Sequence, residues 1–137
     1  MVGVYREDNL IESFVSEEKT SEALPKIFNE ILSRFDINRV FYARGPGSFM
    51  AIKVSYIFLM SLAVVKNIEL FGADGFNFND NLPIKAHGSF YFIKENGKIS
   101  TIKIEKPEKE YKFKLPKVLD SAIFGKDIEP LYILPAV

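Results

Sequence analysis

The chain of 137 residues contains no cysteine, no tryptophan and a single histidine, His87. Without cysteine there is no disulfide framework, no thiolate metal site and no thiol nucleophile. One histidine excludes a multi-histidine metal site, and a lone histidine without a positioned partner is a poor general base. We therefore expect no metal, no cofactor and no catalytic residues.

Net charge is also lacking, because 18 Lys and Arg residues balance 18 Asp and Glu residues. A protein that binds nucleic acid through bulk electrostatics needs a basic excess or a basic face. The composition therefore argues against direct nucleic-acid binding. Zero net charge also gives the chain no electrostatic protection against self-association.

The N-terminus lacks the apolar core of a signal peptide, since Arg6, Glu7 and Asp8 stand where that core is needed. Residues 49–65 approach the length of a membrane span, but Lys53 interrupts them and the apolar run that follows is short. We therefore expect a soluble, cytoplasmic protein with no membrane partner.

What is present is an alternation of strand and helix patterns that predicts an α/β fold. The patterns predict a hairpin over residues 2–15, a helix over 21–35, a strand over 38–43, a helix over 48–66 and a strand over 68–71. Strand, helix and strand in this order are the unit of a parallel sheet with a right-handed crossover.

The polar, turn-rich residues 75–83 predict a boundary between two lobes, 1–78 and 79–137. In the second lobe, Asn96-Gly97 between two β-prone runs predicts a hairpin over residues 89–104. A short helix over 116–124 and a final strand over 131–134 complete the prediction.

The turn between the strand over 38–43 and the following helix reads Gly45-Pro46-Gly47-Ser48-Phe49. Gly45 and Gly47 can adopt the positive φ of a sharp reversal, and Ser48 is a candidate helix N-cap. Such a turn is either a structural corner or a cradle for phosphate, because amides and the helix dipole converge on it. Walker-type and nucleophile-elbow spacings are both missing.

The helix over residues 48–66 has almost no polar face. A helix that is apolar all round must be covered all round, and a sheet can cover only one side of it. Little of this chain remains to cover the other side, so we expect a second protein there.

The segment Arg44-Gly-Pro-Gly-Ser-Phe49 resembles the Gly-Arg-Gly-Pro-Gly-Ser-Phe-Thr-Gly-Leu-Arg-Ile-Gly signature of the TsaB (YeaZ) family. Met50 and Ala51 replace Thr-Gly, Lys53 replaces the arginine and Ser55 replaces the last glycine. Upstream, residues 21–32 resemble the Ser-Glu-x-Leu-Leu-Pro-x-Ile helix of that family. Downstream, residues 68–73, 87–91 and 129–133 are similar to an Ile-Pro-Leu-x-Gly-Val strand, an Arg-x-Gly-Glu-Val-Tyr strand and a Pro-Val-Tyr-Leu-Arg ending.

The resemblance implies an actin-like (ribonuclease-H-like) N-terminal lobe and a small β-rich C-terminal lobe. The family's first strand, Ile-Leu-Ala-Ile-Asp-Thr-Ser, has no counterpart, and with it the phosphate loop of actin-like ATPases is missing. The implied role is that of a non-catalytic subunit in N6-threonylcarbamoyl-adenosine modification of tRNA. It would pair with a TsaD-type enzyme, act beside a TsaE-type ATPase and meet tRNA only through the complex.

Family members are also labelled glycoprotease-like, but we expect no peptidase activity because no metal-ligand cluster is present. We expect the two N-terminal helices to form a homodimer when the chain is alone and a heterodimer with the TsaD-type subunit. The contact residues expected are Leu24, Phe28, Ile31, Met50, Val54, Ile57, Phe58 and Ser61. Two rival hypotheses stay open: a phosphate- or nucleotide-binding enzyme that uses the Gly45–Phe49 turn, and a self-associating structural module.

Overall fold

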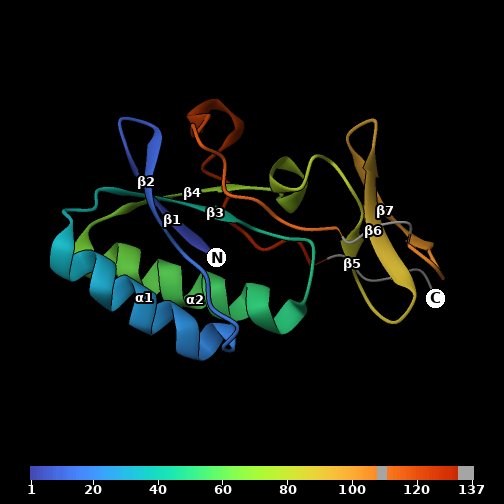
Figure 1. The fold of residues 1–137 in the computed structure, drawn as a ribbon, viewed down its shortest axis with the longest axis horizontal. Coiled ribbons are helices and arrows are strands. Elements are labelled where there is room, and N and C mark those ends of the chain that lie inside the picture. The colour runs from blue at the N-terminus through green and yellow to red at the C-terminus, as the bar shows by residue number, and fades with distance from the viewer. Residues whose placement is uncertain (108–110, 133–137) are drawn as a thin grey trace.

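The computed structural model describes residues 1–107 and 111–132, which form a mixed α/β fold with two α-helices in the described part (Figure 1). The elements in chain order are β1 (Val2–Arg6), β2 (Asn9–Phe14), α1 (Thr20–Arg34), β3 (Arg39–Ala43), α2 (Phe49–Lys66), β4 (Glu69–Ala73), the 3-10 helix η1 (Gly75–Phe78), β5 (Ile84–Lys85), β6 (Phe90–Glu95), β7 (Lys98–Lys103) and the 3-10 helix η2 (Ser121–Ile123).

Both predicted hairpins are confirmed. β1 and β2 pair antiparallel, and the two residues between them, Glu7 and Asp8, both have positive φ, of 52° and 66°. β6 and β7 pair antiparallel around Asn96 and Gly97, with φ of 51° and 77°. Two-residue loops with positive φ at both positions match the twist of antiparallel strands, and Asn-Gly, as in the second hairpin, is a favoured pair for them.

The predicted strand–helix–strand unit is confirmed as well. β3 pairs with β4 in parallel over their full lengths, from Arg39 opposite Glu69 to Ala43 opposite Ala73, and α2 is the crossover. α2 ends at Asn67, which takes the left-handed conformation with φ of 54°. Asparagine is one of the few residues that tolerate this conformation, so it stops the helix and starts the return to β4.

The described core consists of two apolar clusters. Phe28, Tyr42 and Leu59 join α1, β3 and α2, whereas Phe76, Ile84 and Phe92 join η1 to the sheet of β5, β6 and β7. In Figure 1 the two long helices lie side by side on one face of β1–β4, and β5–β7 stand at the other end of the molecule.

The segment after β7 returns to the N-terminal elements. The Leu10 amide donates to the Lys117 carbonyl at 2.9 Å, the Leu119 amide donates to the Asp8 carbonyl at 2.7 Å, and Gly72 and Gly125 form an antiparallel bridge. Residues from both sides of residue 78 therefore pack together, and the proposed division into lobes 1–78 and 79–137 stays a prediction.

Three local predictions need correction. Ser48 occupies the N-cap position of α2, but its side chain makes no capping hydrogen bond. The short helix expected over 116–124 is reduced to the single turn of η2 (Ser121–Ile123). Leu131 and Tyr132 are not in a strand, and the rest of the strand expected over 131–134 lies outside the described residues.

Candidate protein-interaction surface

The solvent-facing side of α2 is formed largely by apolar side chains. Met50 is 71% exposed, Ile57 is 53% exposed and Val64 is 78% exposed. These residues are seven positions apart, so they lie on one face of the helix. Of the residues in α2, only Ile52 and Leu59 are buried. The helix therefore presents to solvent the kind of apolar face that soluble monomers usually cover.

A groove of about 330 Å³ lies between α1 and α2, beside that face. Ile57 and Phe58 both line it, but they differ in their surroundings. Phe58 packs on Phe28 of α1 with ring centroids 5.6 Å apart, whereas Ile57 points to solvent. The residues lining the groove are Thr20, Ser21, Leu24, Pro25, Val54, Ile57, Phe58 and Ser61.

Five of the eight expected contact residues thus line one groove: Leu24, Val54, Ile57, Phe58 and Ser61. Met50 lies on the exposed face of α2. The Ser61 hydroxyl donates to the Ile57 carbonyl of the preceding turn at 2.8 Å, so its polar group is satisfied within the helix. The groove therefore offers mainly apolar surface to a partner.

The placement of the other two expected contact residues is corrected by the structure. Phe28 and Ile31 are only 7% and 2% exposed, and both belong to the core beneath α1. A helix with a wide apolar stripe directs part of that stripe to its own sheet, and these two residues lie on that part. Neither is available on the free surface.

The turn Gly45–Phe49 is tied into the surrounding structure. The Gly45 carbonyl accepts from the Gly75 amide at 2.8 Å, and the neighbouring Arg44 carbonyl accepts from the Leu131 amide at 2.7 Å. Arg44 also pairs with Asp127 at 3.1 Å, so its charge has a partner. These contacts favour the structural corner over the phosphate cradle.

Of the two glycines in this turn, only Gly45 needs the freedom that glycine provides. Its φ is 103°, and a Cβ there would lie 2.7 Å from Ile52 Cδ1. Gly47 has no positive φ, and a Cβ there would meet Ile52 at an ordinary 3.7 Å. Both glycines can adopt a positive φ, and in the structure only Gly45 does so.

Ionisable groups in the described residues do not gather into a reactive site. No group of three or more His, Asp or Glu residues there is placed to hold a metal ion. His87 is exposed in the loop between β5 and β6, and its carbonyl accepts from the Phe90 amide at 2.9 Å. Burial raises the pKa of Tyr42, whose hydroxyl donates to the Ile128 carbonyl, and burial also raises the pKa of Tyr5.

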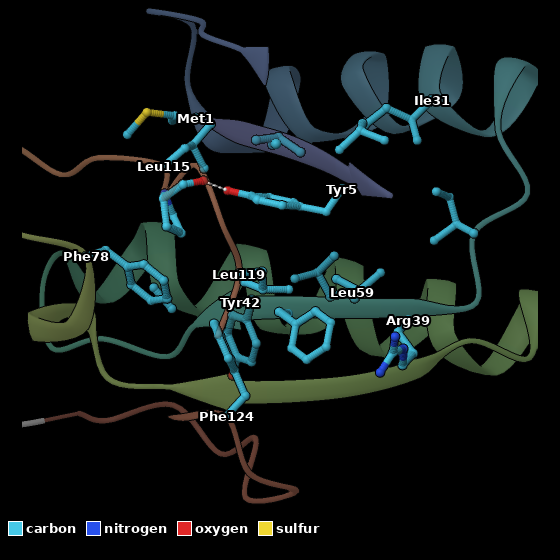
Figure 2. Close-up of a pocket in the computed structure, with 18 of the residues that line it drawn as sticks. Met1, Tyr5, Ile31, Arg39, Tyr42, Leu59, Phe78, Leu115, Leu119 and Phe124 are labelled. Carbon is cyan, nitrogen blue, oxygen red and sulfur yellow. Dashed lines mark hydrogen bonds between the residues drawn. The ribbon is translucent and has the colours of Figure 1, made fainter. Parts of the chain in front are cut away.

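A second, larger cavity of about 490 Å³ lies between β1 and β3 (Figure 2). We call it the β1–β3 slot. No local sequence pattern indicates this cavity, because it depends on which strands fail to pair. β1 pairs only with β2 and β3 pairs only with β4, so in the described chain they form two separate two-stranded sheets. Tyr5 closes over the slot by donating from its hydroxyl to the Pro116 carbonyl at 2.6 Å.

By length and composition, α2 also meets the description of a membrane-spanning helix, with 11% of that span buried. The expectation that Lys53 disqualifies this segment is therefore too strict. One such helix is a weak indication, because the core helices of soluble proteins have the same length and composition.

The chain matches no protein-family model and no curated protein sequence. The resemblance to the TsaB family therefore rests on the quoted motifs alone.

Proposed function

We propose that this protein is a non-catalytic, cytoplasmic subunit that pairs with a TsaD-type enzyme in threonylcarbamoyl-adenosine modification of tRNA. The observation that carries the proposal is the exposed apolar face of α2 next to the α1–α2 groove. Met50, Ile57 and Val64 form that face, and each is more than half exposed. Together with the TsaB-like motifs, this face supports pairing through helices.

The groove explains how such pairing would work. Two helices of a partner laid against α1 and α2 would cover Ile57 and fill the space beside Phe58, which makes a four-helix interface. An interface of this kind is driven by apolar burial, at about 25 cal/mol per Å². It needs no catalytic group and no basic surface from this chain, in agreement with its composition.

The test is association with the TsaD-type protein encoded in the same genome. Ile57→Glu places a carboxylate on the face that would be buried, and burying a charge without a partner is unfavourable. We expect affinity to fall at least about tenfold, which corresponds to about 1.4 kcal/mol. Isothermal titration measures the dissociation constants of the two forms.

Ile102→Glu is the matched control. Ile102 is also an exposed isoleucine, 39% exposed, but it lies on β7, away from the two helices. The control should bind like the unsubstituted chain. Equal losses from both substitutions, or no binding by the unsubstituted chain, would overturn the proposal.

The phosphate-binding alternative has a separate test. Titration of the isolated chain with ATP or a sugar phosphate should show no tight binding. A dissociation constant below about 10 μM, near −7 kcal/mol, would favour the enzyme hypothesis instead.

A further inference from the structure

We propose that Arg44 is a positioning residue for partner binding, because it holds the segment 125–132 along α2 and so completes the partner surface on that helix. Its guanidinium Nε donates to the Glu129 carbonyl at 2.7 Å, and its Nη2 pairs with the Asp127 carboxylate at 3.1 Å. Its own carbonyl accepts from the Leu131 amide at 2.7 Å. Arg44 therefore fixes alternate residues of an extended segment, and its side chain is only 16% exposed.

Two further contacts hold the segment against the parallel strands. Gly125 forms an antiparallel bridge with Gly72 of β4, and the Tyr42 hydroxyl of β3 donates to the Ile128 carbonyl. A Cβ at Gly72 would lie 3.0 Å from the Asp127 carbonyl oxygen, so the segment passes directly against the backbone of β4. The segment is therefore anchored on β3 and β4 where it approaches α2.

The end of the segment follows α2. The Tyr56 hydroxyl donates to Glu129 Oε1 at 3.4 Å. Three residues further on, the Tyr132 ring packs edge-on against Phe49, with ring centroids 5.7 Å apart. Phe49 and Tyr56 are separated by about 10 Å along the helix axis, a distance that three extended residues also span. The segment therefore runs antiparallel to α2, toward the N-terminal end of the helix.

Helix geometry places the segment at one edge of the exposed face of α2. Successive residues are about 100° apart around a helix, so Phe49 and Tyr56 lie about 80–100° from Ile57 on one side. Val54 and Phe58, which line the α1–α2 groove, lie about 60–100° from Ile57 on the other side. The exposed face around Ile57 is therefore bounded by α1 along one edge and by the segment 125–132 along the other.

A face bounded on both sides fits the partner helix that lies along α2. Tyr132 is 48% exposed and Phe49 is 41% exposed, so their aromatic pair offers contact area at the N-terminal end of this face. Aromatic rings are frequent binding hot spots. Holding Tyr132 in place before association removes the entropy cost of ordering its side chain at the interface. This inference rests on the proposed function, because its partner is the same helical subunit.

The first measurement uses the isolated chain. Arg44→Ala removes both side-chain contacts with the segment, so amide hydrogen exchange at residues 125–132 should become about tenfold faster or more. Arg39→Ala is the matched control, because it removes the same charge from the other end of β3, where Arg39 lies over the Phe41 ring. The control should leave exchange in the segment unchanged. Unchanged exchange in Arg44→Ala would overturn the proposal.

The second measurement is the affinity for the TsaD-type protein, determined by isothermal titration. Arg44→Ala and Tyr132→Ala should each weaken binding by about fivefold or more. Tyr132→Phe and Arg39→Ala should bind like the unsubstituted chain, since the first keeps the aromatic ring and the second keeps the Arg44 contacts. Tyr132→Ala should also keep slow exchange at residues 125–131, so its loss of affinity cannot come from release of the segment.

The outcomes separate this inference from the proposed function. Weakened binding in Ile57→Glu together with unchanged affinity in Arg44→Ala and Tyr132→Ala would overturn the inference and leave the proposed function standing. No binding by the unsubstituted chain would overturn both. Equal losses of affinity in Arg39→Ala and Arg44→Ala would also overturn the inference, because charge rather than the position of the segment would then control binding.

Discussion

At the scale of single residues, the two glycines of the Gly45–Phe49 turn belong to one sequence motif, but only one of them needs the backbone freedom of glycine. Gly45 has a φ of 103° and no room for a Cβ beside Ile52, whereas Gly47 has neither restriction. We expect Gly45→Ala to destabilise the fold by about 1–3 kcal/mol, because an L side chain is strained at that φ. Gly47→Ala should change stability by less than about 0.5 kcal/mol. Urea denaturation measures the free energy of unfolding of both variants. Equal losses of stability would contradict the conclusion that only Gly45 needs to be glycine.

The burial of Tyr42 predicts that the protein is less stable at alkaline pH. Its hydroxyl donates to the Ile128 carbonyl, and burial raises its pKa above the ordinary value near 10. Because the pKa of Tyr42 is higher in the folded state than in the unfolded state, the stability that its neutral hydroxyl contributes is complete below about pH 10. That stability is lost as pH rises toward the folded-state pKa. We expect the free energy of unfolding to fall above about pH 10.

Tyr42→Phe isolates that contribution. The variant loses the hydrogen bond and leaves the Ile128 carbonyl without its donor, so it should be about 1 kcal/mol less stable at pH 7. Above pH 10 its stability should fall less steeply than that of the unsubstituted chain, because one ionisation is gone. Urea denaturation at pH 7 and at about pH 11 measures both effects, and parallel pH profiles would refute the role of Tyr42.

At the scale of elements, α2 has two different faces that its sequence does not distinguish. Phe58 packs on Phe28 of α1, and its neighbour Ile57 is 53% exposed. We expect Phe58→Ala to destabilise the isolated chain by about 1–3 kcal/mol, below the full loss for a deeply buried phenylalanine. Ile57→Ala should change stability by less than about 0.5 kcal/mol. Thermal unfolding of the two variants tests this, and a greater loss from Ile57→Ala would reverse the assignment of the faces.

The same helix shows what the sequence could and could not predict. Hydrophobic period and turn residues were sufficient for both hairpins and for the β3–α2–β4 unit, because these features depend on neighbours in the chain. The outward residue of α2 was beyond prediction, since a helix without a polar face carries no periodic signal. Phe28 and Ile31 were wrongly expected at the partner interface for a related reason. The wide apolar stripe of α1 does not reveal which of its residues face the sheet.

At the scale of the whole molecule, features that depend on distant segments were missed. The β1–β3 slot exists because two strands remain apart, and no local pattern encodes a missing pairing. The return of residues 113–131 over the N-terminal elements, through contacts such as Leu119 with Asp8, had no local signal either. The returning segment supplies Leu115 and Leu119 to the lining of the β1–β3 slot, whereas the α1–α2 groove is lined by residues of the two helices.

The last prediction concerns the oligomeric state of the isolated chain. Zero net charge offers no repulsion between copies, and the face formed by Met50, Ile57 and Val64 is apolar and exposed. Two copies related by a two-fold axis can cover each other's α1–α2 grooves, since such an interface uses the same patch on both. We therefore expect a homodimer in sedimentation experiments at micromolar concentration, and Ile57→Glu should shift it toward monomer.

A TsaD-type protein that offers similar helices would compete for the same surface. Adding it in equal amount should replace the homodimer by a heterodimer. Ser55→Phe is a control and should leave both associations intact, because Ser55 lines the β1–β3 slot. Sedimentation velocity separates the three species by mass. A chain that stays monomeric at micromolar concentration, and still does so in the presence of the TsaD-type protein, would show that the apolar face of α2 serves neither contact. That face would then need another explanation, and its membrane-like composition would be the next property to test with lipid vesicles.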